Sequence, residues 1–192
     1  MKAYYDARAP EYDEWYLGAG RFAERDRPFW GEELEQVVGV VAALPPARTL
    51  DVACGTGFLT RHLRGEVVGL DQSARMLELA SRHVDVVQGE ALGLPFPDDA
   101  FERIFTASFY GHLEPGERER FLAEARRVAP ELVVVDAALR DDVPPEQVEE
   151  RMLRDGSRWH VYKRYFTPEG LAAELGGGRV LHAGSWFVAV AA

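Results

Sequence analysis

The 192-residue sequence is short of cysteine, of lysine and of long apolar stretches. Its single cysteine, Cys54, excludes an intramolecular disulfide and any metal site built from several cysteines, and no other metal site is expected. No stretch approaches the ~18 apolar residues that suggest a membrane span. The polar and aromatic first residues do not resemble a signal peptide. These absences predict a single domain in the cytoplasm.

Positive charge is also scarce. The chain has 22 lysines and arginines against 32 aspartates and glutamates, which gives a formal net charge of -10. A protein that binds nucleic acid non-specifically needs a basic face to displace counterions from phosphates, so no nucleic-acid partner is expected. The remaining composition, 47% hydrophobic and 28% charged, is typical of a globular domain.

Short β-branched segments alternate with amphipathic segments in the middle of the chain. Helices are expected at about Pro28–Leu44, Phe58–Arg64, Ala74–Arg82, Glu117–Val128 and Pro145–Arg154, with a short one after Thr167. Strands are expected at Thr49–Ala53, Val67–Asp71, Val84–Gln88, Arg103–Thr106 and Leu132–Asp136. This alternation predicts a parallel sheet with helices on both faces.

The last residues break that pattern. The apolar runs Val180–Ala183 and Trp186–Ala191 are separated by Gly184-Ser185, a pair typical of a tight hairpin turn. A mostly parallel sheet should therefore finish with an antiparallel strand.

Two acids mark a candidate nucleotide site. Asp51 ends the first strand and is followed by the glycine-rich turn Cys54-Gly55-Thr56-Gly57, at the strand end where open α/β sheets bind ligands. Asp71 ends the next strand, 71 − 51 = 20 positions later, where a carboxylate can accept both ribose hydroxyls of an adenosine. Each feature also has an alternative explanation. Many strand–helix junctions contain a glycine-rich turn for packing alone, and Asp71 could simply be an acid at a helix N-terminus.

Asp51 bears on which nucleotide binds. A carboxylate at the entrance of the turn would repel the pyrophosphate of a dinucleotide, which docks on the helix N-terminus. It would suit the sulfonium and ammonium groups of S-adenosylmethionine (SAM). Electrostatics therefore favours SAM over NAD.

With these features the sequence resembles the class I SAM-dependent methyltransferases, and within them the small-molecule branch of the ubiquinone/menaquinone-biosynthesis type. The resemblance is carried by DVACGTG, VVGLDQSARMLELA and QGEALGLPFPDDAFERIF, while YYDARAPEYDEWY resembles the family's N-terminal lid. It implies an α/β fold: a Rossmann-like, doubly wound, seven-stranded and mostly parallel sheet with an antiparallel last strand. The cofactor-binding residues that it implies are Tyr4, Tyr12, Asp51, Ala53, Cys54, Gly55, Gly57, Asp71, Gln72, Met76, Glu90, Ala91, Thr106 and Ser108.

Two positions depart from the family pattern. Ala53 replaces the first glycine of the first motif, a mild change if its backbone is not at positive φ. Glu90 replaces an aspartate and adds one methylene. Neither change removes a donor or acceptor. Cys54 is expected to be a small buried residue of the turn rather than a nucleophile.

The acceptor side is expected in two segments. The first, Thr106–His112, follows the fourth strand, and the second is Arg158–Tyr165. His112 and His160 are candidate bases because a histidine pKa suits proton transfer. Tyr110, Arg158 and Tyr162 are candidate substrate contacts, with Arg158 or Arg164 holding an anionic group. Alternation should put His160 and Tyr162 on one face and Trp159 on the other. His112 could instead cap a helix, and the second segment could be an exposed basic edge strand.

The expected layout is one domain, 1–192. It comprises a lid (1–27), a cofactor-binding core (28–139), a substrate-side insertion (140–166) and a terminal helix and hairpin (167–192). The expected function is methyl transfer from SAM to a small organic acceptor by in-line displacement, which leaves S-adenosylhomocysteine (SAH). One alternative is a non-catalytic SAM- or SAH-binding or regulatory protein of the same fold, and a weaker one is an NAD-dependent oxidoreductase. The sequence assigns no oligomeric state.

Overall fold

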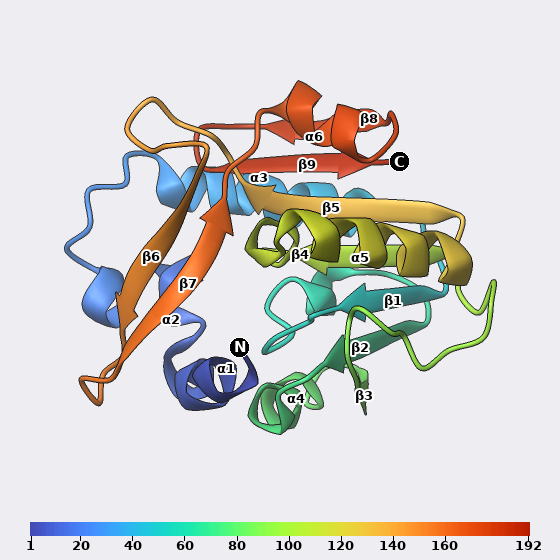
Figure 1. The fold of residues 1–192 in the computed structure, drawn as a ribbon, viewed down its shortest axis with the longest axis horizontal. Coiled ribbons are helices and arrows are strands. Elements are labelled where there is room, and N and C mark those ends of the chain that lie inside the picture. Colours follow the sequence, from blue (N-terminus) through green and yellow to red (C-terminus); the bar gives the residue numbers. More distant parts are fainter.

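The computed structural model describes residues 1–192 and is built on a seven-stranded sheet of order β3-β2-β1-β4-β5-β9-β8 (Figure 1). Its strands are β1 (Thr49–Val52), β2 (Val67–Asp71), β3 (Asp85–Gln88), β4 (Arg103–Ala107), β5 (Glu131–Ala137), β8 (Arg179–Ala183) and β9 (Phe187–Ala191). Strands β1 to β5 pair in parallel, and β9 pairs antiparallel with both β5 and β8. The parallel sheet and its terminal antiparallel hairpin are thus confirmed.

Four helices pack on this sheet: α3 (Trp30–Ala43), α4 (Ala74–Ala80), α5 (Pro115–Val128) and α6 (Pro168–Glu174). The starts of the two short ones follow from their caps. The Ser73 hydroxyl accepts a hydrogen bond from the Met76 amide at 3.2 Å, and the Thr167 hydroxyl accepts one from the Gly170 amide at 3.0 Å. The expected helix at Phe58–Arg64 is reduced to a single 3-10 turn, Thr60–His62.

Both faces of the sheet are buried, with α5 on one face and α3 on the other (Figure 1). Along β5, Val134 packs in the cluster that includes Phe121 of α5. Its neighbours Val133 and Val135 pack in the opposite cluster, which includes Val37 of α3. A strand covered on both faces needs a continuous apolar run rather than an alternating one, which is what Leu132–Val135 supplies.

Residues 146–164 form a separate antiparallel pair, β6 (Glu146–Met152) and β7 (Arg158–Arg164). The expected helix at Pro145–Arg154 is therefore wrong. Along β6, the partly buried side chains Gln147, Glu149 and Arg151 are polar, whereas Val148 is 63% exposed. In most strands the apolar side chains are buried and the polar ones exposed. Because this is reversed in β6, the hydrophobic pattern does not reveal the strand.

The N-terminal segment, with helices α1 (Lys2–Arg8) and α2 (Glu14–Leu17), lies with the β6–β7 hairpin at the carboxyl ends of the parallel strands (Figure 1). Three side-chain hydrogen bonds tie it to the turns there. Ser73 donates to Asp6 at 2.6 Å, Thr56 donates to Asp13 at 2.5 Å, and the hydroxyls of Tyr16 and Ser108 lie 3.2 Å apart.

None of the helices combines the length and the apolar character needed to cross a membrane.

Candidate active site

The turn after β1 uses three left-handed residues in close succession: Ala53 (φ 61°), Gly55 (φ 57°) and Gly57 (φ 81°). The two glycines adopt this conformation without steric cost, but alanine does not. Ala53 was expected to be a mild departure from the family motif only if its backbone is not at positive φ. Because its φ is positive, the change from glycine is not mild. At Gly55 a Cβ atom would lie 3.4 Å from the Tyr12 ring, an ordinary van der Waals contact, so the positive φ rather than a lack of space favours glycine there.

Asp51 is a buried acid with a free acceptor. Its Oδ2 accepts a hydrogen bond from the Thr60 hydroxyl at 2.5 Å, whereas Oδ1 is buried and has no partner. Burial raises the pKa of this carboxyl to about 8. An orphaned carboxylate oxygen next to the turn suits a cationic ligand group, because such a group would supply the missing partner.

Asp71 is fixed by the backbone on both sides. Its Oδ2 accepts from the Gly55 amide at 3.0 Å and its Oδ1 from the Ser73 amide at 2.8 Å. Burial raises the pKa of Asp71, while these backbone hydrogen bonds act in the opposite direction. Each carboxylate oxygen keeps a further lone pair that can accept a ligand hydroxyl, as the ribose assignment requires.

A cavity of about 240 Å³, the cofactor cleft, opens beside this turn. It brings together eight of the predicted cofactor residues: Tyr12, Ala53, Gly55, Asp71, Gln72, Glu90, Ala91 and Ser108. Asp51 and Cys54 line a small hollow that shares Tyr12 and Ala53 with the cleft. Burial raises the pKa of the Cys54 thiol, which fits the expected structural role rather than a nucleophile.

The other four predicted cofactor residues line neither the cleft nor the small hollow beside it. Gly57 packs on Ala80, Met76 is fully buried in α4, and Thr106 donates its hydroxyl to the Val52 carbonyl at 2.7 Å. Tyr4 lines a second cavity instead.

Sequence reasoning missed several residues of the cleft, including Tyr5, Leu70, Gly89, Leu92, Phe109, Leu113 and Glu117. Most of them immediately flank or lie inside the quoted motifs, so proximity to a motif was the signal that could have found them.

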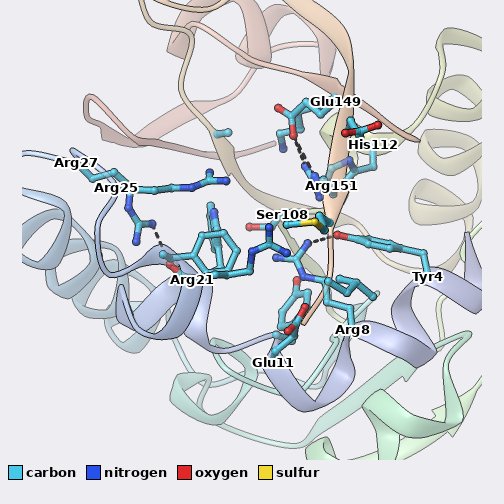
Figure 2. Close-up of a pocket in the computed structure, with 18 of the residues that line it drawn as sticks. Tyr4, Arg8, Glu11, Arg21, Arg25, Arg27, Ser108, His112, Glu149 and Arg151 are labelled. Carbon is cyan, nitrogen blue, oxygen red and sulfur yellow. Dashed lines mark hydrogen bonds and ion pairs between the residues drawn. The ribbon is translucent and has the colours of Figure 1, made fainter. Parts of the chain in front are cut away.

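The second cavity, of about 390 Å³, lies between the N-terminal segment and the β6–β7 hairpin (Figure 2). It shares Tyr5, Tyr12, Ser108 and His112 with the cofactor cleft. The two cavities therefore meet at these four residues.

His112 is positioned at that junction by a polar network. Its Nδ1 lies 2.7 Å from the Tyr162 carbonyl oxygen, which can only accept, so Nδ1 carries the proton and Nε2 keeps a lone pair. Burial, followed by the charges of Lys163 and Arg151, holds the pKa of His112 well below its usual range. The imidazole is therefore neutral near pH 7.

Asp136 holds this segment in place. It accepts from the Gly111 amide at 2.8 Å and from the Lys163 ammonium at 2.5 Å. Only glycine fits at position 111, because a Cβ atom there would lie 2.6 Å from the Arg164 carbonyl oxygen.

The other predicted acceptor-side residues lie outside both cavities. In β7, His160 and Arg158 are exposed, and Tyr162 donates its hydroxyl to Glu146 at 2.6 Å. The alternation of β7 is as expected, but the cavity lies on the opposite side, with Lys163. Tyr110 is buried and bonds to Glu174 at 3.2 Å, and Arg164 pairs with the same carboxylate.

The lining residues that sequence reasoning missed here include Gln147, Glu149, Arg151 and Lys163. No alternation in the sequence could have found those on β6, because polar side chains occupy both faces of that strand.

Known proteins match this chain in the region of the glycine-rich turn and in the overall fold. Residues 49–131 match the family model described as "Methyltransferase domain". Demethylmenaquinone methyltransferase of Thermotoga maritima is 36% identical over 102 residues, 49% of this chain and 44% of the relative. The 2-phytyl-1,4-naphthoquinone methyltransferase of Synechococcus elongatus is 31% identical over 121 residues, 53% of this chain and 48% of the relative. The chain thus spans less than half the length of these curated relatives.

Solved structures match over a longer range. A structure described as a DhpI-SAM-HEP complex has a TM-score of 0.79 and 26% identity, and the match covers 99% of this chain and 94% of that one. A glycopeptide N-methyltransferase, MtfA, complexed with sinefungin, shares the fold at a TM-score of 0.61 and 17% identity, with 82% and 91% covered. Residues 49–131 therefore match a methyltransferase domain, and the chain shares its fold over nearly its whole length with a structure described as a SAM complex.

Proposed function

We propose that this chain binds SAM in the cofactor cleft and transfers its methyl group to a small organic acceptor in the second cavity. The observation that carries the proposal is the junction of the two cavities at Tyr5, Tyr12, Ser108 and His112. Two ligands bound in cavities that share these residues would lie at close range, and such alignment is worth roughly 7–11 kcal/mol of a barrier.

When bound, SAM supplies an electrophilic methyl group, which an acceptor lone pair attacks while the carbon–sulfur bonding pair leaves on the sulfur of SAH. Asp71 would hold the ribose hydroxyls, and Asp51 would face the cationic part of the ligand. Glu90 and Ala91 would lie against the adenine. Residues 1–27 would act as the lid, since they hydrogen-bond to the turns after three strands.

His112 is the candidate general base. Its Nε2 lone pair can accept the proton that an acceptor hydroxyl, amine or acidic carbon loses as it is methylated. A positioned base of this kind contributes typically ~10²–10⁴-fold. Its lowered pKa keeps the lone pair available near pH 7.

A quinone-type ring is one candidate acceptor, suggested by the names of the curated relatives. The aromatic lining of the second cavity, which includes Tyr4, Trp15, Trp30 and Trp186, favours a planar ring.

Calorimetric titration with SAH tests cofactor binding. We expect the Asp71→Ala variant to bind SAH at least tenfold more weakly. The charge-matched variant at exposed Asp141, Asp141→Ala, should bind within twofold of the parent. A parent chain that does not bind SAH would contradict the proposal.

Transfer is tested separately, with methyl-labelled SAM and the small-molecule fraction of a cell extract. We expect label in a small product, a loss of about 10²-fold or more in His112→Gln, and no loss in His83→Gln, a variant of an exposed histidine. SAH binding without labelled product would favour the non-catalytic alternative.

A further inference from the structure

Positive charge gathers around the second cavity although the chain as a whole is acidic. Seven cationic side chains line it: Arg8, Arg21, Arg25, Arg27, Arg140, Arg151 and Lys163. Three of the seven are paired with carboxylates, as Arg140 with Asp142, Arg151 with Glu149 and Lys163 with Asp136. The other four, Arg8, Arg21, Arg25 and Arg27, have no carboxylate within 4.0 Å and are here named the arginine cluster.

Arg8 is the buried member of the arginine cluster. The side chain is only 8% exposed, and Figure 2 shows it reaching into the cavity. It donates one hydrogen bond, to the Tyr4 hydroxyl at 2.6 Å, and its guanidinium lies 4.9 Å from the centre of the Tyr12 ring. A guanidinium has five donors, and a buried charge is costly unless it is paired. An anionic ligand would supply the missing partner.

The remaining members of the arginine cluster act on one another. Burial lowers the pKa of Arg25, and the charge of Arg21 lowers it further. Burial also lowers the pKa of Arg27, with Arg25 as the second cause. The mutual repulsion of these like charges destabilises the free protein, and an anion placed among them would relieve it.

We propose that the arginine cluster binds an oxyanionic group, a carboxylate or a phosphoryl group, carried by the methyl acceptor. Arginine matches either group because its planar fork donates two parallel hydrogen bonds. This inference rests on the proposed function, because it takes the anion to be part of the methyl acceptor. Binding of the oxyanion does not itself require turnover.

The placement of the cluster also orients the acceptor. No member of the arginine cluster lines the cofactor cleft, whereas His112 and Ser108 line both cavities. The oxyanion would thus lie in the second cavity rather than in the cleft, and the atom that receives the methyl group would be a different one, next to His112. That nucleophile loses its proton to His112 Nε2, while the oxyanion keeps its charge throughout.

The cluster lies outside the part of the chain that matches the family model. All four arginines fall between residues 8 and 27, whereas the match begins at residue 49. The glycine-turn motifs therefore carry no information about this group, and its specificity is a property of the N-terminal segment.

The test is a calorimetric titration of inorganic phosphate, and separately of acetate, into the full chain saturated with SAH at low ionic strength. We expect binding of at least one of the two anions. Its dissociation constant should rise at least tenfold in Arg8→Gln and in the double variant Arg21→Gln/Arg25→Gln. The control Arg120→Gln removes the same charge from an exposed site on α5 and should stay within twofold.

Because Arg8 is buried, its variant could fail to fold, and the double variant at two exposed positions covers that case. Saturation with SAH is measured first in every variant, so failure of the proposed function is distinguished from failure of this inference. Phosphate binding identifies a phosphoryl group and acetate binding a carboxylate. No binding of either anion, or equal binding by all variants, would overturn the inference.

Discussion

At the scale of single residues, the candidate site is marked by two unfavourable local features, one near the end of β1 and one in the turn that follows. Ala53 adopts a left-handed conformation that costs a non-glycine residue about 1–2 kcal/mol. Two positions earlier, Asp51 buries a carboxylate oxygen without a partner. Strain and unpaired polar atoms that persist in a folded protein cluster at functional sites, so both features agree with the placement of the cofactor cleft.

Ala53→Gly should stabilise the free protein slightly. Relief of the left-handed strain is partly offset by the greater freedom of glycine in the unfolded chain, so we expect a gain of about 1 kcal/mol or less in the free energy of unfolding. The matched control is Ala123→Gly, at an exposed position of α5, where we expect a loss of about 0.5–1 kcal/mol. Urea unfolding measures both, and a loss at position 53 equal to that at 123 would contradict the left-handed assignment.

Asp51 should make stability depend on pH. Its folded pKa of about 8 lies above its ordinary value of 3.8, so its stabilising contribution is fully present below about pH 4 and is lost as the pH rises to 8. We therefore expect Asp51→Asn to gain stability relative to the parent between pH 5 and pH 8, by a few kcal/mol at most. Urea unfolding at both pH values measures this, and an unchanged difference between the two proteins would count against the raised pKa.

The same group should couple cofactor binding to protons. A cationic ligand favours the ionised carboxylate, so binding of SAM at pH 7 should release protons from Asp51. Calorimetry in buffers of different ionisation enthalpy detects that release. It should shrink in Asp51→Asn, whereas Asp141→Asn, which changes an exposed acid, should behave like the parent.

The two acids of the candidate cofactor site were predictable from sequence, but the arginine cluster was not. Asp71 is the last residue of β2 and Asp51 the last but one of β1, and a sheet brings the ends of its adjacent parallel strands together. Arg8 and Arg25 share no such spacing. They meet because the N-terminal segment folds over the strand ends, and no periodicity in the sequence encodes that path.

At the scale of elements, one carboxylate of α3 holds the terminal hairpin. Glu33 is buried and accepts hydrogen bonds from the amides of Ser185, Trp186 and Phe187, at 3.0, 2.9 and 2.7 Å. His182 lies 3.3 Å from the same side chain. The Gly184-Ser185 turn predicted the hairpin, but the anchor that connects it to a helix about 150 positions earlier was not predictable from local sequence.

Glu33→Gln should destabilise the protein markedly. An amide presents one acceptor oxygen and one donor group where three backbone donors converge, so we expect a loss of about 2–4 kcal/mol in the free energy of unfolding. Glu32→Gln, the adjacent exposed position in the same helix, should change it by about 0.5 kcal/mol or less. Thermal unfolding compares the two, and equal effects would mean that the hairpin does not depend on this carboxylate.

Elements were predictable where burial and apolar character coincide. Helix α5 places Phe121, Leu122 and Ala125 on one buried face, and the sequence predicts it closely. Strand β6 instead turns Gln147, Glu149 and Arg151 toward the second cavity. A strand whose inner face lines a polar cavity has the same composition as a solvated helix, which is why it was predicted as one.

At the scale of the whole molecule, the N-terminal segment is held in place by a few hydrogen bonds, by ion pairs of Glu11 and Glu14 with Arg154, and by aromatic packing. Tyr16 contributes to the packing and to the hydrogen bonds, because its ring stacks on Phe58 at 4.2 Å and its hydroxyl lies 3.2 Å from that of Ser108. These contacts are few compared with the sheet core, so the segment should open more readily than the domain unfolds.

Tyr16→Phe should weaken this closure without removing the ring. Loss of one hydrogen bond, worth about 0.5–1.5 kcal/mol, should speed SAH dissociation by roughly two- to tenfold and raise amide exchange in residues 2–22. Tyr110→Phe loses a hydroxyl bond to Glu174 elsewhere in the core and should leave both rates unchanged. Stopped-flow release and hydrogen exchange measure the effects, and equal changes in both variants would argue against a lid.

The N-terminal segment carries the arginine cluster and also closes over the turns that line the cofactor cleft. A single piece of chain therefore forms the wall of one cavity and the cover of the other. An acceptor bound to the arginine cluster would hold this piece of chain down, and so would slow any nucleotide exchange that requires the cover to lift. We therefore expect ordered steady-state kinetics, in which the nucleotide adds before the acceptor and the methylated product departs before the spent nucleotide.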